Sequence, residues 1–499
     1  MRIAFLSAER VPLVKVGGLG DVASALTDVL AERGHAVDCF LPDYRSLTIP
    51  LGAERTPLLD VFPVPFGDRD ELAAVHRLRL PGSRATIYLV DHEGARAYFQ
   101  REGIYVDPAT GEEYPDNAER FLFFCRAVCE SLKRLGRRPD IVHLNDFQTS
   151  FAAAYLRVAY AGDPFFMRTG IVFTAHNVGY QGIYPAATLA KAGLPGTGVA
   201  PGSPFEFYGK LNFLKVGLEF SDILTTVSPR YAKEIQTTAE YGHGLEGVFR
   251  ARAADLRGIL NGIDTQVWNP ETDSEIAARY SAQELAGKTV CRNALAREAG
   301  WPEDSEWPIV GIVSRLAGQK GFDLLEAAEA QLAELEMRLF VLGSGERRYH
   351  DLFARWTKEI PERVHAVFGF DEPLSHRIEA GADLFLMPSR YEPCGLNQMM
   401  SLRYGTVPVV RATGGLADTV HDFDPASGKG NGFSFEPYDA AAMVTCLERA
   451  LAAYRQPQLW RRVQANGMAE DFSWDASAKK YEETYAEAMG RAQNRGVAR

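Results

Sequence analysis

Features that mark metal-binding, disulfide-linked and membrane proteins are scarce in this 499-residue chain. Its six cysteines are scattered, with no CxxC pair and no cysteine–histidine cluster at zinc spacing, so we expect reduced thiols. No segment approaches the roughly 20 apolar residues of a membrane span. The N-terminus enters a strand-like run without the basic start and apolar stretch of a secretion signal. The resulting expectation is a cytoplasmic protein that has no membrane partner.

Positively charged residues are also fewer than negatively charged ones. The 54 lysines and arginines are outnumbered by 65 acidic residues, which gives a net charge of −11. A nucleic acid or an anionic membrane would normally require a basic stripe, so neither partner is expected, whereas a neutral partner such as a sugar remains open. The 46% hydrophobic content is typical of a globular protein, and the length favours two domains of about 200 to 250 residues.

Short apolar runs alternate with amphipathic stretches along most of the chain. Strands are predicted at residues 2–8, 36–42, 85–91, 140–146 and 170–177, and again at 307–316, 337–345, 364–370, 382–389 and 407–415. Helices are predicted between several of them, including Leu19–Arg33 and Asn117–Arg134, and an amphipathic helix at 472–490 has Trp474, Tyr481 and Tyr485 to bury. Buried parallel strands joined by helices predict α/β doubly wound domains, which bind ligands at the C-terminal ends of their strands.

The stretch "KVGGLGDV" at residues 15–22 places a lysine and paired glycines at the predicted start of a helix. Glycines let an anion approach the unpaired amides of a helix N-terminus, and a lysine adds a mobile positive charge. Gly18, Gly20 and Ala23 fit G-x-G-x-x-A, but a loop separates them from the preceding strand and no acid is suitably placed after the second strand. We therefore reject a dinucleotide site, and glycines that merely pack the helix onto the strand remain the alternative.

The second half repeats this arrangement. Lys320 lies seven residues after Val313, where the apolar run "PIVGIV" ends, just as Lys15 lies seven residues after Ala8, so the two turns could face each other across a cleft. Arg315 shares the loop "SRLAGQKG" with Lys320, and such side chains commonly bind diphosphates, although a solvated surface loop is the alternative. Glu392, in "PSRYEPCGLNQ", could bond sugar hydroxyls or could simply favour a helix dipole.

Eight motifs together carry a resemblance to a known family. They are "KVGGLGDV", "TAHNVGYQG", "FLKVGLEFSDILTTVSP", "YGHGLEG", "GILNGIDTQVWNP", "SRLAGQKG", "PSRYEPCGLNQ" and "ATGGLADTV". Over residues 1 to about 490 the chain resembles bacterial glycogen synthases and plant starch synthases, the ADP-glucose-using, retaining branch. The resemblance implies an α/β GT-B fold, with two Rossmann-like doubly wound parallel-sheet domains facing across a cleft. The expected parts are residues 1–257, residues 258–472, and a helix at 473–499 that packs back on the N-terminal domain.

The same resemblance implies roles for individual residues. The expected catalytic residues are Glu392, His176, Arg315 and Lys320. The expected substrate-binding residues are Lys15, Gly17, Gly18, Asp21, Asp146, Asn261, Phe370, Cys394, Gly395 and Leu396. Lys15 and its glycines would contact the donor's diphosphate opposite Arg315 and Lys320, while Glu392 would bind glucose hydroxyls. His176 would lie over the donor sugar and help stabilise positive charge at the anomeric carbon, the alternative being a buried structural histidine.

Three places differ from the pattern of this family or of related GT-B enzymes. The family commonly reads His-Asp-Trp-His where this chain has Asn145, Asp146, Phe147 and Gln148, so the acceptor could be held differently. A base-stacking tyrosine of related enzymes is replaced by Phe370, which keeps a face for adenine and loses a hydroxyl. The second glutamate of many GT-B enzymes, an acid that bacterial glycogen synthases also lack, is replaced by Met400, so recognition of the ribose must come from elsewhere.

The expected reaction is transfer of glucose from ADP-glucose to the non-reducing O4 of an α-1,4-glucan, with retention and without a cofactor or metal. The "DRD" at 68–70 and "DFD" at 422–424 do not end apolar strands as a metal-binding D-x-D would, so we interpret them as loop charges. No side-chain nucleophile is evident, which favours attack by the acceptor on the leaving-group side. A UDP-glucose-using synthase, another GT-B enzyme that epimerises or hydrolyses a nucleotide-sugar, and a non-catalytic glucan-binding protein remain as alternatives.

Overall fold

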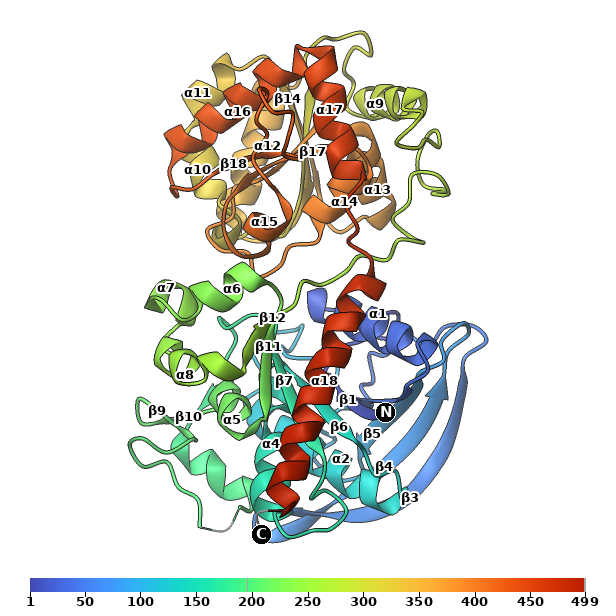
Figure 1. The fold of residues 1–499 in the computed structure, drawn as a ribbon, viewed down its shortest axis with the longest axis vertical. Coiled ribbons are helices and arrows are strands. Elements are labelled where there is room, and N and C mark those ends of the chain that lie inside the picture. The colour runs from blue at the N-terminus through green and yellow to red at the C-terminus, as the bar shows by residue number, and fades with distance from the viewer. Residues whose placement is uncertain (195, 498–499) are drawn as a thin grey trace. The chain divides into compact units, whose positions relative to one another are not determined.

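The computed structural model describes residues 1–194 and 196–497 (Figure 1). The chain divides into two compact units. The N-terminal unit comprises Met1–Val227, Ala232–Ile259 and Ser477–Arg499, and the C-terminal unit comprises Ser228–Tyr231 and Leu260–Ala476. Apart from the short segment Ser228–Tyr231, the chain passes from the first unit to the second after Ile259 and returns after Ala476.

Within the described residues, the N-terminal unit contains a nine-stranded sheet in the order β12-β11-β7-β6-β1-β2-β5-β4-β3. The strands are β1 (Arg2–Leu6), β2 (Ala36–Pro42), β3 (Glu54–Phe66), β4 (Arg69–Arg79), β5 (Thr86–His92), β6 (Ile141–Asn145), β7 (Gly170–Ala175), β11 (Ile223–Thr226) and β12 (Leu256–Gly258). Neighbours from β12 to β5 pair in parallel, whereas β4 is antiparallel to both β5 and β3. The strand order reverses between β1 and β6, and such a switch point opens a crevice at the carboxyl ends of the strands.

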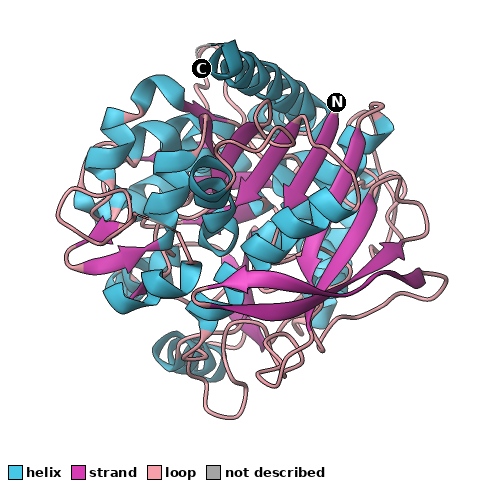
Figure 2. Ribbon diagram, turned by 90° about the horizontal axis from the view of Figure 1, so that it is seen from below, coloured by secondary structure: helices cyan, strands magenta, loops and turns pink. Residues whose placement is uncertain are grey.

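Helices cover both faces of this sheet (Figure 2). The helices described for this unit are α1 (Gly18–Glu32), α2 (Asn117–Arg134), α3 (Asp146–Thr149), α4 (Phe151–Ala154), η1 (Tyr155–Ala159), η2 (Ala186–Ala192), α5 (Phe213–Phe220), α7 (Ala239–Gly242), α8 (Glu246–Ala251) and η3 (Ala253–Asp255). A small separate sheet has the order β8-β10-β9, formed by β8 (Ile183–Tyr184), β9 (Glu206–Phe207) and β10 (Lys210–Asn212). Helices α6 (Pro229–Glu234) and α18 (Trp474–Val497) contain residues of both units.

The described part of the C-terminal unit has a six-stranded sheet in the order β15-β14-β13-β16-β17-β18, and all of its pairs are parallel. Its strands are β13 (Ile309–Val313), β14 (Arg338–Gly343), β15 (Val364–Phe368), β16 (Leu384–Met387), β17 (Val407–Arg411) and β18 (Phe433–Phe435). Its helices are α9 (Ala286–Glu298), η4 (Gly318–Lys320), α10 (Phe322–Ala327), α11 (Glu329–Glu334), α12 (Arg347–Glu359), α13 (Glu372–Gly381), α14 (Asn397–Arg403), α15 (Gly414–Thr419), α16 (Ala440–Tyr454) and α17 (Pro457–Met468). Here the order reverses between β13 and β16, which gives this unit its own switch point.

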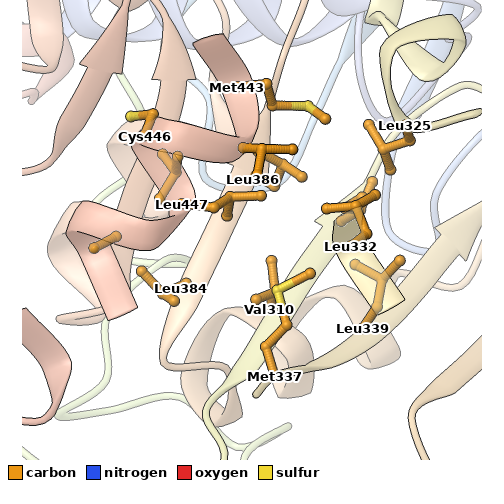
Figure 3. Close-up of a cluster of buried hydrophobic side chains, with 14 of the residues drawn as sticks. Val310, Leu325, Leu332, Met337, Leu339, Leu384, Leu386, Met443, Cys446 and Leu447 are labelled. Atoms are coloured by element: carbon orange, nitrogen blue, oxygen red, sulfur yellow. The ribbon is translucent and has the colours of Figure 1, made fainter. Parts of the chain in front are cut away.

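The core of the C-terminal unit shows why short apolar runs became strands. Leu386 of β16 lies beside Met443 and Leu447 of α16, Val310 of β13 belongs to the same cluster, and all four are almost fully buried (Figure 3). Burying a side chain of this size contributes about 1.5 to 3 kcal/mol relative to leaving it exposed. A parallel strand buried on both faces therefore needs a continuous apolar run, and such a run is visible in the sequence.

The predicted strands and the helices of both halves are confirmed, with boundaries that move by a few residues. The closing helix begins at Trp474, and Tyr481 and Tyr485 are fully buried, as expected. The Tyr485 hydroxyl lies 2.8 Å from His143 Nδ1 of β6, which fixes this helix (red in Figure 1) to the N-terminal sheet.

The long β3–β4 hairpin was not anticipated. Proline-rich β3 is largely exposed, so it lacks the apolar run that revealed the buried strands. The "DRD" residues belong to its turn and to the start of β4, and Asp422 of "DFD" pairs with Arg449 at 2.8 Å. In the described residues no group of three or more acidic, histidine or cysteine side chains could hold a metal ion, and no helix is both long and apolar enough to cross a membrane.

Candidate active site

Residues 7–17 connect β1 to α1 and contain the predicted phosphate-binding loop. Lys15 Nζ pairs with Asp21 at 2.8 Å, and both side chains are partly exposed. A Cβ added to Gly17 or Gly18 would meet nothing within 4 Å, and neither residue has the positive φ that favours glycine. Neither packing nor conformation requires glycine here, so the packing alternative loses support. Bare backbone at this point allows a ligand to approach the N-terminus of α1.

Glu9 was not singled out from the sequence, yet it organises this loop. Its Oε2 accepts hydrogen bonds from the amides of Val16 at 2.7 Å and Gly17 at 2.9 Å, and its Oε1 accepts one from the Tyr105 hydroxyl at 2.7 Å. Glu9 is buried. The Gly17 amide is thus already bound by a carboxylate, so an anion at this helix would meet the amides from Gly18 onward.

His176 and Asp146 meet where β6 and β7 end, near the switch point. The His176 amide donates to Asp146 Oδ1 at 2.7 Å, and ring Nε2 lies 2.9 Å from Asn145 Oδ1. Burial lowers the pKa of His176 to about 3, so the ring is neutral at neutral pH. Burial raises the pKa of Asp146 to about 7, even though the backbone amides of His176 and Asn177 favour its ionised form. Asp146 has a φ of 56°, an uncommon value outside glycine.

A hollow of about 430 Å³ adjoins this position in the N-terminal unit. It is lined by Phe147, the residue after Asp146, and by Glu113, Tyr180, Gln181, Tyr184 and His243, among others. Tyr180 is half exposed. The hollow therefore combines aromatic faces with amide, carboxyl and imidazole groups, a mixture that suits a polar ligand with apolar ring faces.

The predicted residues of the C-terminal unit converge on an ion pair. Lys320 Nζ lies 2.6 Å from Glu392 Oε2, and Ser389 Oγ donates to the same oxygen at 3.0 Å. The Lys320 and Glu392 side chains are only 19% and 8% exposed. They follow β13 and β16, the two strands that flank the switch point. Lys320, predicted to bind the diphosphate, thus contacts Glu392, predicted to bind the glucose hydroxyls.

Glycines and one glutamine hold these loops together. Gly321 has a φ of 80°, and a Cβ there would lie 2.1 Å from the Pro388 carbonyl oxygen. A Cβ on Gly415 would lie 2.0 Å from the Cys394 carbonyl oxygen, so α15 packs directly beneath the Glu392 loop. Gln398 Nε2 donates to the carbonyls of Cys394 at 3.0 Å and Gly395 at 3.1 Å. The quoted motifs contain these residues, but residue type and spacing alone assign them no role.

The remaining predicted residues lie on loops that follow strands β12, β13, β15 and β16. Arg315 is exposed, and its guanidinium makes no hydrogen bond or ion pair with any described residue. Phe370 follows β15 and is 80% exposed. Asn261 is buried beside Cys394, and its Oδ1 has no hydrogen-bond partner among the residues the structure describes. Leu396 precedes α14 directly after Gly395, which has a φ of 71°. An unpaired arginine and an exposed aromatic ring leave positive charge and a flat face available to a ligand.

Two family models match the chain. The starch synthase catalytic domain model matches residues 2–251, and the model of glycosyl transferases group 1 matches residues 296–466. The chain is 47% identical to the glycogen synthase of Koribacter versatilis over 493 residues, which cover 98% of each protein. It is 43% identical to the glycogen synthase of Thermotoga maritima over 495 residues, covering 98% of this chain and 99% of that protein.

Solved structures agree with these matches. The catalytic domain of starch synthase IV from Arabidopsis thaliana, bound to ADP and acarbose, has a TM-score of 0.87 and 34% identity, covering 98% of this chain and 99% of that one. Sucrose-phosphate synthase from Thermosynechococcus elongatus has a TM-score of 0.61 at 20% identity, a likeness of fold alone. Both likenesses extend over nearly the whole length of the chain.

Proposed function

The chain belongs to the glycogen synthase and starch synthase family of GT-B glycosyltransferases, and on this premise we propose that it transfers glucose from ADP-glucose to the non-reducing O4 of an α-1,4-glucan with retention of the anomer. The observation that carries the proposal is the Lys320–Glu392 pair, together with Arg315, which lies on the loop of Lys320 and is unpaired among the described residues. Cations and a carboxylate at one switch point suit a ligand that has a diphosphate at one end and hydroxyls at the other.

The diphosphate is the proposed ligand of the cations. Departure of the nucleoside diphosphate leaves extra negative charge on its oxygens, and preorganised positive groups stabilise that charge. Arg315 offers a free fork for bidentate contact, Lys320 offers a point charge, and Lys15 with the α1 N-terminus offers a third group. With these groups in place we propose that no metal ion or cofactor takes part, and activity should survive a chelator.

The glucosyl group and the base are assigned to other residues. Glu392 accepts hydrogen bonds from glucose hydroxyls, for which Lys320 must move from the carboxylate to the diphosphate. Asn261 Oδ1, buried without a partner among the described residues, is a second acceptor for a polar group of the donor. Phe370 supplies a stacking face for adenine. The family relative bound to ADP supports this choice of nucleotide over UDP.

The acceptor is proposed to use the hollow lined by Phe147 and Tyr180. Pyranose rings have apolar faces and polar rims, so aromatic side chains and the Gln181 amide suit them. Binding of acarbose by the starch synthase IV relative supports a glucan acceptor. Since no side-chain nucleophile is assigned, the acceptor attacks on the side from which the diphosphate departs, and neutral His176 stabilises the positive anomeric carbon.

A donor-competition assay tests the proposal. Purified enzyme is given ADP-glucose and UDP-glucose at equal concentration with a glycogen primer, and labelled glucose is followed into α-1,4 linkages. Preferential use of ADP-glucose that depends on primer supports the proposal. Preferential use of UDP-glucose, or release of free glucose or an epimer without elongation, would contradict it. We also propose a cytoplasmic location, which is supported by six free and buried cysteines.

A further inference from the structure

Asn145 ends β6 and is fully buried, yet its side chain makes two directed hydrogen bonds. Nδ2 donates to the Leu6 carbonyl oxygen at 2.9 Å, and Oδ1 lies 2.9 Å from Nε2 of His176. The orientation of this amide is determined by chemistry, because a carbonyl oxygen only accepts and the atom facing Leu6 must therefore be the NH₂ group. The atom that faces the His176 ring is then an oxygen, which also only accepts.

The consequence for His176 follows directly. Nε2 must carry the proton, and in a neutral ring Nδ1 then keeps its lone pair. No described residue hydrogen-bonds to Nδ1. The His176 amide is held separately by Asp146 Oδ1 at 2.7 Å, so the backbone and the ring are both fixed. The backbone of Asn145 is held as well, because its backbone N–H donates to Thr149 Oγ1 at 2.6 Å.

We propose that Asn145 is a positioning residue that holds His176 as the Nε2–H tautomer and leaves Nδ1 to accept a hydrogen bond from a hydroxyl of the donor sugar. The second half of this proposal rests on the proposed function, in which His176 contacts the donor. It specifies what the ring offers: an acceptor with partial negative charge, which suits both a hydroxyl and a positive anomeric carbon, and no N–H donor on that edge.

The tautomer can be measured without any ligand. Nitrogen-15 labelling of the ten histidines separates protonated from unprotonated ring nitrogens by chemical shift, and the His176→Gln variant identifies the signals that belong to His176. We expect protonated Nε2 and unprotonated Nδ1 at neutral pH. Asn145→Leu should give a mixture of tautomers, and Asn145→Asp, which keeps an acceptor, should retain the Nε2–H form. Protonated Nδ1 in the wild-type enzyme would overturn the proposal even if Asn145→Leu does not fold.

Kinetics separate positioning from a purely structural role. Asn145→Leu should lower kcat about three- to tenfold, the effect of one misdirected neutral hydrogen bond, while the donor KM changes less than about twofold. Thr149→Val is the matched control, because it removes a buried hydrogen bond at the Asn145 backbone and leaves the side-chain contacts intact. It should lower stability and keep both the tautomer and kcat.

Two results would count against the proposal in different ways. An unchanged tautomer and unchanged kcat in a folded Asn145→Leu variant would overturn the role of Asn145. Normal kcat in His176→Ala would instead overturn the catalytic use of His176 in the proposed function, while the ring spectrum of the wild-type enzyme would still decide the tautomer.

Discussion

Replacing Glu392 with glutamine removes one negative charge from the Lys320–Glu392 pair and changes little else. The glutamine has the same length, keeps one oxygen for Lys320 Nζ or Ser389 Oγ, and fits the same loop. The perturbation therefore tests charge and not packing.

The structure gives the expected size of the changes in stability, kcat and ADP affinity. Breaking a buried ion pair by removing one partner costs about 3 to 5 kcal/mol, but Lys320 is 19% exposed and can turn to solvent, so we expect a loss of about 1 to 2 kcal/mol in the free energy of unfolding. Charge-assisted bonds to sugar hydroxyls are about twice as strong as neutral ones, so kcat should fall at least about tenfold, or about 1.4 kcal/mol in the barrier. ADP lacks the glucose and meets a released Lys320, so its affinity should stay unchanged or rise up to about threefold.

Three measurements decide the matter. Primer-dependent ADP release gives kcat, calorimetric titration gives the affinity for ADP, and denaturant unfolding gives stability. Glu298→Gln is the control, because Glu298 pairs with Arg377 at 2.9 Å in the same unit but is partly exposed and belongs to no predicted site. Loss of ADP affinity together with several kcal/mol of stability would show that Glu392 only maintains the fold. Near-normal kcat and stability would refute both roles.

Three further predictions concern single side chains. Lys15→Ala should lower kcat/KM by about 1 to 3 kcal/mol of transition-state binding without affecting stability, because among the described residues Lys15 pairs with a partly exposed aspartate; wild-type kcat/KM would remove Lys15 from the donor site. Gly18→Ala should weaken ADP binding in calorimetric titration while the melting temperature stays constant. Gly415→Ala should instead lower the melting temperature strongly, because its Cβ would lie 2.0 Å from a carbonyl oxygen. The reverse pattern would refute this assignment of the glycines. The hydrogen bond from Arg33 lowers the pKa of Glu482 from 4.5 to about 2, so its stabilisation is present above pH 4.5 and lost as the pH falls toward 2. At this partly exposed site the loss should reach at most about 1 kcal/mol, measured as the difference in acid sensitivity between the wild-type enzyme and Glu482→Gln, and equal sensitivity would contradict it.

Local sequence patterns were sufficient to predict the buried strands and the helices that pack on them. The parallel strands needed continuous apolar runs, and the helix at Asn117–Arg134 was predicted with its observed bounds because its apolar residues recur at helical spacing. The β3–β4 hairpin escaped prediction because a half-exposed antiparallel pair is stabilised across strands and not by one continuous run. The sequence therefore predicted the elements whose apolar pattern lies within one segment, and these elements define the fold class.

For the candidate site too, some features followed from the sequence and others only from the tertiary structure. Motifs located Lys320 and Glu392 on loops after strands, since residue type and position in a motif are properties of the sequence. Their 2.6 Å contact spans 72 residues and was decided only by the crossing of two loops, which Gly321 permits by letting the chain approach Pro388. The same is true of Glu9 beneath the Lys15 loop and of Asn145 against His176. A hydrogen bond between distant residues depends on orientation as well as identity, and orientation is set when the strands pack side by side.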